Sequence, residues 1–263
     1  MTGDSEIWLK PVAMFKDPFR ANCNAVLVLC ETFIHDKVTP ARYNFRHIAT
    51  KVMDAAKDQD PWFGIEQEFF LTFKDGSLHS RPYQWPRNGY PEPQGQYYCG
   101  VGASNAIGRK VIEDSYRAFL FAGLMISGIN AEVAPSQWEY QVGITKGIEC
   151  GDHMWMARYI VQRVGENYGV DCDFEPKPVL GDWNGSGCHC NFSFNKTRQE
   201  GGFDHIIKHC MPKLSAKHKE HLALYGEGNE ARLTGLHETS SMDTFTYHVR
   251  SRGASVRIPV TCE

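Results

Sequence analysis

The stretch Trp62-Phe-Gly-Ile-Glu-Gln-Glu-Phe-Phe-Leu-Thr-Phe73 combines an alternating pattern with many aromatic residues. Alternation with a period of two indicates a β-strand, because successive side chains of a strand point to opposite faces. The segment Lys74-Asp-Gly76, which is typical of a turn, is expected to end this strand. Glu66 and Glu68 are therefore predicted to project together from one face, with Gln67 on the other.

Two carboxylates side by side on an otherwise aromatic strand are costly, because like charges repel and burial penalises ionised groups. A cation beside Glu66 and Glu68 would remove that cost, which is the physical reason to suspect a metal site. The alternative is an edge strand with a solvated face. That alternative explains the same two residues without any ligand.

The rest of the chain predicts a mixture of helices and strands. Further strands are expected in three segments: 25–30, which suits a buried strand, 130–142, and 188–194. Helices are expected where apolar residues recur at intervals of three and four: 40–60, 104–123, 152–167 and 203–224. Residues 80–103 are expected to form one long ordered loop, and 225–259 a tail that contains glycine and arginine. Because no repeat or low-complexity linker divides the chain, residues 1–263 are predicted to form a single α+β domain.

The composition is that of an ordinary globular protein, with 42% hydrophobic and 22% charged residues. A formal net charge of -3 does not favour nucleic acid or an anionic membrane as the main partner. Nine irregularly spaced cysteines, with no charged and then apolar leader before them, predict a reduced, cytoplasmic protein. The longest apolar runs fall short of the ~20 residues that a spanning helix needs, so no membrane segment is expected.

Three more potential ligands lie in apolar surroundings. Glu132 and Glu139 are flanked by valine, isoleucine and tryptophan, and carboxylates are rarely placed there without a partner. His189 lies in an alternating segment, where a lone histidine is more often a hydrogen-bonded core residue. Four glutamates and one histidine suit Mg²⁺ or Mn²⁺ better than zinc, which prefers sulfur and imidazole. Cys188 and Cys190 could suggest zinc, but a single C-x-C pair is a weak signal, and core packing is the preferred interpretation.

Positive charge is concentrated near the end of the chain, with one glutamate among the arginines: Arg232, Arg250, Arg252, Arg257 and Glu238. Guanidinium groups bind carboxylates and phosphates through paired hydrogen bonds. Metals and arginines together describe a site that neutralises a polyphosphate and a carboxylate at once. The alternative is a solvated basic surface, which is the preferred interpretation for Arg250.

Five segments, in this order, resemble the signature segments of the eukaryotic-type glutamine synthetase family: Gly64-Ile-Glu-Gln-Glu68, Gln94-Gly-Gln-Tyr-Tyr-Cys-Gly-Val-Gly102, Asn130-Ala-Glu-Val-Ala-Pro-Ser-Gln-Trp-Glu139, Gly181-Asp-Trp-Asn-Gly-Ser-Gly-Cys-His189 and His237-Glu-Thr-Ser240. The resemblance extends from about Pro11 to Pro259. It implies an α+β catalytic domain in which a curved, mainly antiparallel sheet lines the active site and helices pack outside.

The resemblance also implies metal and substrate roles for matching positions. Ligands of the metal that holds glutamate and the γ-phosphate match Glu68, Glu132 and Glu139. Part of the second metal site, on the ATP side, matches Glu66 and His189. Glutamate binding is implied for Asn184, Gly185, His189, Glu139 and Arg232.

Nucleotide and catalytic roles are implied in the same way. Contacts to ATP match Trp62, Ser193, Arg198, Arg252 and Arg257. Arg232 and Arg252 match arginines that grip the substrate carboxylate and the transferring phosphoryl group. Glu238 matches a flap glutamate that closes over the site and helps to take the proton from ammonium.

The implied activity is ATP-dependent ligation of ammonia to L-glutamate through γ-glutamyl phosphate, with two or more Mg²⁺ or Mn²⁺ ions in each site. The implied partners are glutamate, ammonia, ATP and further copies of the chain, because the family forms stacked rings. The family's N-terminal β-grasp domain and its C-terminal segment, which carries a further metal-ligating glutamate, are expected to lie outside this chain. Assembly is therefore expected to be weakened.

Two other interpretations stay open: a non-catalytic relative that retains nucleotide or subunit binding, and a divergent ligase that joins another amine to glutamate. Retention of five potential metal ligands together with Glu238 favours the active ligase over the first alternative. A site released from catalysis would tend to lose buried charges that are costly to keep.

Overall fold

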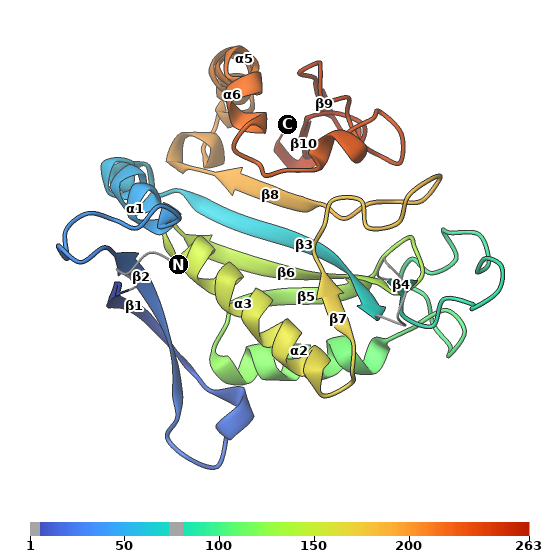
Figure 1. The fold of residues 1–263 in the computed structure, drawn as a ribbon. Helices are drawn as coiled ribbons and strands as arrows, with labels where there is room; N and C mark the ends of the chain where they lie inside the picture. The colour runs from blue at the N-terminus through green and yellow to red at the C-terminus, as the bar shows by residue number, and fades with distance from the viewer. Residues whose placement is uncertain (1–5, 74–80, 263) are drawn as a thin grey trace.

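The computed structural model describes residues 6–73 and 81–262. At its centre lies a six-stranded sheet in the order β4-β3-β6-β5, with β7 and β8 also paired to β3, and every pair is antiparallel (Figure 1). Its strands are β3 (Trp62–Phe73), β4 (Arg81–Pro82), β5 (Ile126–Ala131), β6 (Gln137–Lys146), β7 (Asp171–Asp173) and β8 (Cys188–Ser193). The strand predicted at 62–73 is confirmed. The turn predicted at Lys74-Asp-Gly76 lies outside the described residues.

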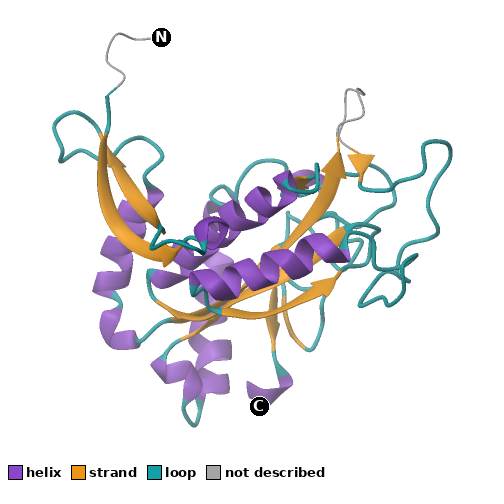
Figure 2. Cartoon of the chain, turned by 90° about the horizontal axis from the view of Figure 1, so that it is seen from below, coloured by secondary structure: helices purple, strands orange, loops and turns teal. Residues whose placement is uncertain are grey.

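Two helices cover one face of this sheet, α2 (Arg109–Ala122) and α3 (Glu149–Glu166) (Figure 2). Both were predicted, although α2 begins five residues later than expected. Between helices and sheet lies the main core, in which Phe119 of α2 packs against Tyr140 of β6 with ring centroids 5.2 Å apart. Phe69 of β3 adds a third ring, 5.8 Å from Tyr140. The apolar face of β3 is therefore buried here, which leaves its other face for the polar residues.

Gly108 sets the start of α2, because this N-cap residue has a φ of 82°, in the left-handed region. A Cβ atom at Gly108 would lie 2.3 Å from Cδ1 of Leu71, which is fully buried and has little room to move. We expect Gly108→Ala to lower the free energy of unfolding by about 2–4 kcal/mol, from backbone strain and overpacking together. Gly123, the C-cap of the same helix, has a φ of 85° but no atom within 4 Å of a Cβ. Gly123→Ala should therefore cost only about 1–2 kcal/mol in urea denaturation, and equal losses would contradict the packing argument.

The N-terminal part forms a hairpin of β1 (Trp8–Lys16) and β2 (Val26–Phe33), which projects from the body of the molecule (Figure 1). The strand at 25–30 was predicted, but its expected burial is wrong. Val26 and Val28 are 46% and 47% exposed, because only one face of the hairpin meets the core. β1 was not predicted, since proline and lysine interrupt its apolar pattern.

Helix α1 (Phe45–Ala55), which is shorter than the predicted 40–60, is fixed to the body by one arginine. The Nε of Arg46 lies 2.7 Å from Asp152 Oδ1 in α3, and its Nη2 donates to Asp152 Oδ2 at 2.9 Å. Its Nη1 lies 3.1 Å from Glu31 Oε1 in β2. Both carboxylates are buried, so this guanidinium neutralises two charges and joins three elements.

The segment 130–142 was predicted as one strand, and this is wrong. It contains the end of β5, a tight connection and the start of β6, which pair as a hairpin with Asn130 opposite Glu139. The chain reverses at Pro135-Ser136, where Ser136 has a φ of 63°. Glu132 therefore lies in the connection instead of a strand, and it approaches β6 from beyond the end of β5.

The C-terminal part is more structured than the predicted helix and tail. Its elements are α4 (Gly202–His205), a π-helical turn (Ile206–Cys210), α5 (Met211–Ala216), α6 (His218–Leu222), β9 (Tyr247–Val249) and β10 (Val256–Ile258), with β9 and β10 parallel. Short 3-10 helices cover Pro18–Arg20, Lys57–Gln59, Asn195–Arg198, Asn229–Ala231 and Val260–Cys262. Apart from β4, the described residues of 80–103 form the expected loop. None of the helices within 6–73 and 81–262 has the length and hydropathy that crossing a membrane requires.

Candidate active site

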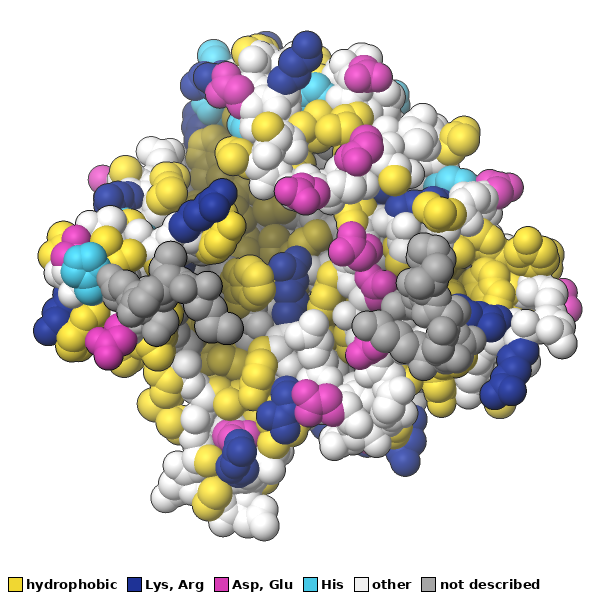
Figure 3. All heavy atoms as spheres, viewed as in Figure 1, with side chains coloured by type: hydrophobic (Ala, Val, Ile, Leu, Met, Phe, Trp, Pro, Cys, Tyr) yellow, Lys and Arg dark blue, Asp and Glu magenta, His cyan; other side chains and the backbone are white. Residues whose placement is uncertain are grey.

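The candidate site lies on the face of the sheet opposite α2 and α3. Glu66 and Glu68 project from this face of β3, while the intervening Gln67 is buried and accepts hydrogen bonds from Arg158 of α3. The strand register places Glu68 opposite Glu139 of β6 and Glu66 opposite His189 of β8. Figure 3 shows the molecule from the side on which α3 lies in front of the sheet, where the surface is hollowed beneath the C-terminal elements and acidic side chains lie beside the hollow; the candidate site lies on the other face of the sheet.

Three carboxylates converge at the centre of the site. Ligand atoms of Glu68, Glu132 and Glu139 all lie within 4.8 Å of one another. Burial, together with the neighbouring carboxylates, raises the pKa of Glu132 to about 8 and that of Glu139 to about 7. Within the described residues, none of the three pairs with a lysine or arginine. A cluster of oxygen ligands at this spacing fits a hard divalent cation, which would remove the repulsion.

Glu66 and His189 form a second polar group beside this cluster. His189 Nδ1 lies 3.1 Å from Glu66 Oε2, and Asn191 Nδ2 donates to Glu66 Oε1 at 2.8 Å. These hydrogen bonds lower the pKa of Glu66 to about 2, and the carboxylate in turn raises the pKa of His189. The charge of Arg257 also favours ionised Glu66, which places this arginine near the site.

The metal-free site has a consequence for stability that depends on pH. Glu132 and Glu139, whose pKa values are raised in the folded protein, ionise near pH 4.5 in an unfolded chain. Between that pH and about 8, the folded protein therefore binds more protons than the unfolded chain. The free energy of unfolding of the chelator-treated protein should therefore fall across this window as pH rises.

We expect Glu139→Gln to remove part of this loss, so that its stability relative to the wild type increases from pH 5 to pH 8. Thermal denaturation in chelator measures the difference at each pH. If the stability difference between Glu139→Gln and the wild type stays constant with pH, the pKa of the Glu139 carboxyl is not raised in the folded protein.

Gln137 was not identified from the sequence, yet it connects the carboxylates to the neighbouring loop. Its Nε2 donates to Glu68 Oε2 at 3.2 Å and to the carbonyl oxygen of Gly185 at 3.0 Å. Glu68 Oε2 also accepts the backbone N–H of Gly187 at 2.8 Å. The burial of Gln137, which is 2% exposed, could not be read from the sequence, because a neutral amide gives no signal of its own.

Arg232 lies against the same loop. A Cβ atom on Gly187 would be 2.7 Å from Nη2 of Arg232, and one on Gly185 would be 3.1 Å from its Cγ, so the two glycines leave room for this side chain in its present position. The Nε of Arg232 is buried without a hydrogen-bond partner. Asn184, the residue before these glycines, donates its backbone N–H to Gln94 Oε1 at 2.9 Å. A guanidinium held here beside Glu68 is placed to receive an anion.

The structure also brings together three residues expected at the ATP end of the site. Ser193 of β8 pairs with Trp62 of β3. Arg198 donates from Nη1 to Ser193 Oγ at 3.0 Å, and its guanidinium carbon lies 4.0 Å from the Trp62 ring centroid. Lys146, which the sequence did not single out, lies 5.0 Å from the same ring. Cations and an aromatic plane in one place suit a nucleotide phosphate and base.

Glu238 and Arg252 lie in the C-terminal part and contact each other. Arg252 Nη1 lies 3.4 Å from Glu238 Oε2, and the side chains are 57% and 59% exposed. Within the described residues, no hydrogen bond or ion pair connects either one to the carboxylate cluster. Arg250 is exposed, as its interpretation as a surface residue expects. The interpretation of Cys188 and Cys190 as core residues is wrong, because both are exposed on β8.

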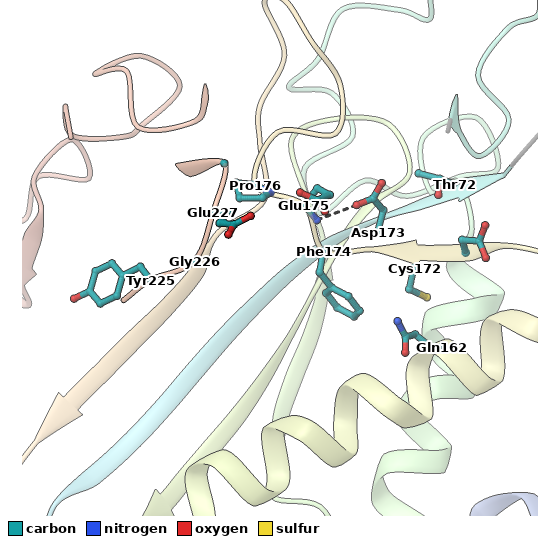
Figure 4. Close-up of a pocket in the computed structure, with 12 residues that line it drawn as sticks. Thr72, Gln162, Cys172, Asp173, Phe174, Glu175, Pro176, Tyr225, Gly226 and Glu227 are labelled. Atoms are coloured by element: carbon teal, nitrogen blue, oxygen red, sulfur yellow. Dashed lines mark hydrogen bonds between the residues drawn. The ribbon is translucent and has the colours of Figure 1, made fainter. Parts of the chain in front are cut away.

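A separate cleft of about 980 Å³ lies near the other end of β3, between β7 and residues 225–228 (Figure 4). Its lining includes Asp173, Glu175 and Glu227, but none of the residues predicted for the site. Glu175 donates its backbone N–H to Asp173 Oδ1 within this cleft. The chemistry is therefore expected at the carboxylate cluster instead of this cleft.

The fold and the site define a class: an α+β domain whose antiparallel sheet presents clustered carboxylates, with arginine beside them, for a divalent cation and anionic substrates. The family model described as glutamine synthetase, catalytic domain, matches residues 42–221. The chain is 54% identical over 259 residues to glutamine synthetase of Neurospora crassa, covering 98% of this chain and 70% of that protein. It is also 54% identical over 257 residues to glutamine synthetase of Suillus bovinus, covering 98% of this chain and 71% of that protein. Over 256 residues it is 54% identical to glutamine synthetase of Hebeloma cylindrosporum, covering 97% of this chain and 70% of that protein. The chain belongs to the glutamine synthetase family.

Proposed function

We propose that this site joins ammonia to L-glutamate with ATP, giving glutamine, ADP and phosphate through γ-glutamyl phosphate. The observation that carries the proposal is the convergence of Glu68, Glu132 and Glu139 within 4.8 Å, next to an arginine, Arg232, whose Nε is buried. Both reactants of the first step are anionic, so a site for this reaction must offset their repulsion. Family membership supports the same reaction.

The carboxylates are the groups that would hold the divalent cations. Glu68, Glu132 and Glu139 form one set of ligands, and Glu66 with His189 forms part of a second. Oxygen-rich ligands favour Mg²⁺ or Mn²⁺. Bound cations of this kind neutralise phosphate charge and help to align the transferred group.

The remaining residues bind and orient the substrates in this proposal. Arg232 binds the glutamate carboxylate beside the loop of Asn184 and Gly185, and Glu139 and His189 complete that subsite. Trp62, Ser193 and Arg198 hold ATP, with Arg252 and Arg257 near its phosphates. Glu238 closes over the site, excludes water that would hydrolyse the acyl phosphate, and accepts a proton from ammonium. In the same proposal, residues 1–263 act as one catalytic domain, the protein forms a homo-oligomer, and it works in the cytoplasm.

The test is a phosphate-release and γ-glutamyl transfer assay with Mg²⁺ or Mn²⁺. Because the chain spans about 70% of its relatives, it is assayed alone and as a chimaera that carries the flanking segments of the Neurospora crassa enzyme. We expect glutamine and phosphate in equal amounts, dependent on ammonia and on the divalent ion. ATP binding without product in both forms would overturn the proposal and favour a non-catalytic relative.

A further inference from the structure

Beyond the carboxylates themselves, two amide side chains form a bridge between two of them. Gln141 of β6 donates from Nε2 to Glu139 Oε1 and, at 2.6 Å, to Asn130 Oδ1 of β5. Asn130 donates from Nδ2 to Glu132 Oε1 at 3.0 Å. A continuous chain of hydrogen bonds therefore runs from Glu139 through Gln141 and Asn130 to Glu132.

The hairpin register builds this bridge. Asn130 lies opposite Glu139, and Gln141 follows Glu139 by two residues on the same face of β6. Glu132 follows Asn130 by two residues, beyond the end of β5. Gly128 lies opposite Gln141, and a Cβ atom there would be 2.9 Å from Gln141 Oε1. The bridge therefore depends on a glycine that leaves room for the amide.

The chemistry of the groups gives the bridge one direction. A carboxylate that ligates a cation is ionised and only accepts hydrogen bonds, so each amide must turn its NH₂ group toward its glutamate. Gln141 then donates one N–H to Glu139 and the other to Asn130. Asn130 uses its NH₂ group for Glu132, so its side-chain oxygen is left to accept from Gln141. Each of the two carboxylates receives one amide N–H in this way, and no positive charge is placed where a metal cation would bind.

We propose that Asn130 and Gln141 are positioning residues that hold Glu132 and Glu139 at the spacing a divalent cation needs. This inference rests on the proposed metal-dependent function. Neutral amides suit the task, because lysine or arginine would form an ion pair with the carboxylates and compete with the metal. Hydrogen-bond partners behind metal ligands typically contribute about 10–100-fold to metal affinity.

The first test measures Mn²⁺ binding directly, by calorimetric titration of the protein without nucleotide. Gln141→Met and Asn130→Leu keep side-chain bulk but remove the N–H donors. Each is expected to weaken Mn²⁺ binding by about 10–100-fold, and the double variant by less than the product of the two, because either change breaks the same bridge. Gln162→Met, at an exposed amide of α3, is the matched control and should bind like the wild type.

Gly128→Ala provides a second, independent variant, because both bridging amides stay in the sequence. Its Cβ meets only the end of a flexible side chain, so the fold should tolerate it while the Gln141 amide is displaced. We expect metal-free thermal stability close to that of the wild type, and Mn²⁺ affinity lowered as in Gln141→Met. Unchanged affinity in Gly128→Ala and in both amide variants would overturn the inference.

Kinetics separate positioning from a general structural defect. If the amides act through the glutamates, saturating Mn²⁺ should restore most of kcat, and the metal concentration for half-maximal rate should increase. A kcat that stays low at every Mn²⁺ concentration would overturn the inference. If the wild type neither binds Mn²⁺ nor forms glutamine, the proposed function fails; if it does both while the variants bind equally well, only the bridge fails.

Discussion

Replacing Glu139 with alanine is expected to lower kcat/KM for glutamine formation by about 10³-fold or more, because a cation at this site neutralises charge worth several kcal/mol in the transition state. Glu139 lies opposite Glu68 in the sheet and belongs to the cluster within 4.8 Å. Its loss would remove one oxygen ligand and leave the cation with fewer contacts. Phosphate release at saturating ATP and a range of Mn²⁺ concentrations measures the effect.

The same change should stabilise the metal-free protein, because it removes one of three repelling carboxylates. Thermal denaturation in chelator is therefore expected to give a higher midpoint for Glu139→Ala than for the wild type, and added Mn²⁺ should raise it less. Glu227→Ala changes an exposed glutamate in the separate cleft and serves as the control. Activity of Glu139→Ala equal to that of Glu227→Ala would contradict the placement of the site.

Replacing Arg46 with methionine is expected to lower the free energy of unfolding by about 3–5 kcal/mol, because a buried charge then loses its partner. Glu31 is 4% exposed and Asp152 is 6% exposed, and both depend on this guanidinium. Methionine preserves much of the apolar stem, so the loss reports on charge and hydrogen bonds rather than volume. Urea denaturation of the metal-free protein measures it.

Arg117→Met is the matched control for that change. Arg117 pairs with Asp114 at 2.8 Å, but the side chains are 74% and 35% exposed. An exposed pair of this kind contributes about 0–1 kcal/mol. Arg46→Lys should fall between the two variants, since one ammonium cannot reach both carboxylates with the same geometry. Similar losses for Arg46→Met and Arg117→Met would contradict the structural role of Arg46.

The parts of the fold that the sequence predicted are those in which a local pattern matches the final environment. β3 combines alternation at Ile65–Glu68 with a continuous aromatic and apolar run that is buried, and its predicted ends coincide with the observed ones. The helices covering the sheet have continuous apolar stripes and were predicted for the same reason. β1 was missed because Lys10 and Pro11 interrupt its apolar pattern, and because its exposed and buried residues do not alternate as they do in a half-buried strand.

The site was predictable only as far as charge and motif extended. Glu66, Glu68, Glu139 and His189 were placed on strands that the structure brings together, but Glu132 was assigned to a strand and lies in a connection. Gln137, Gln141 and Asn130 gave no signal, because a neutral amide becomes informative only once strand pairing brings a carboxylate to it. Arg46 was missed likewise, since its partner Asp152 is 106 residues away in the sequence.

The division of β3 into an apolar face and an acidic face limits how its length can change during evolution. Loss or gain of a single codon inside the strand would rotate every following side chain to the opposite side. Downstream of such an event, Glu68 would be driven into the layer now occupied by Phe69, and that ring would enter the face that carries the carboxylates. Natural variants should therefore accumulate insertions and deletions in the connections around β3, while the number of residues between its two glutamates stays constant.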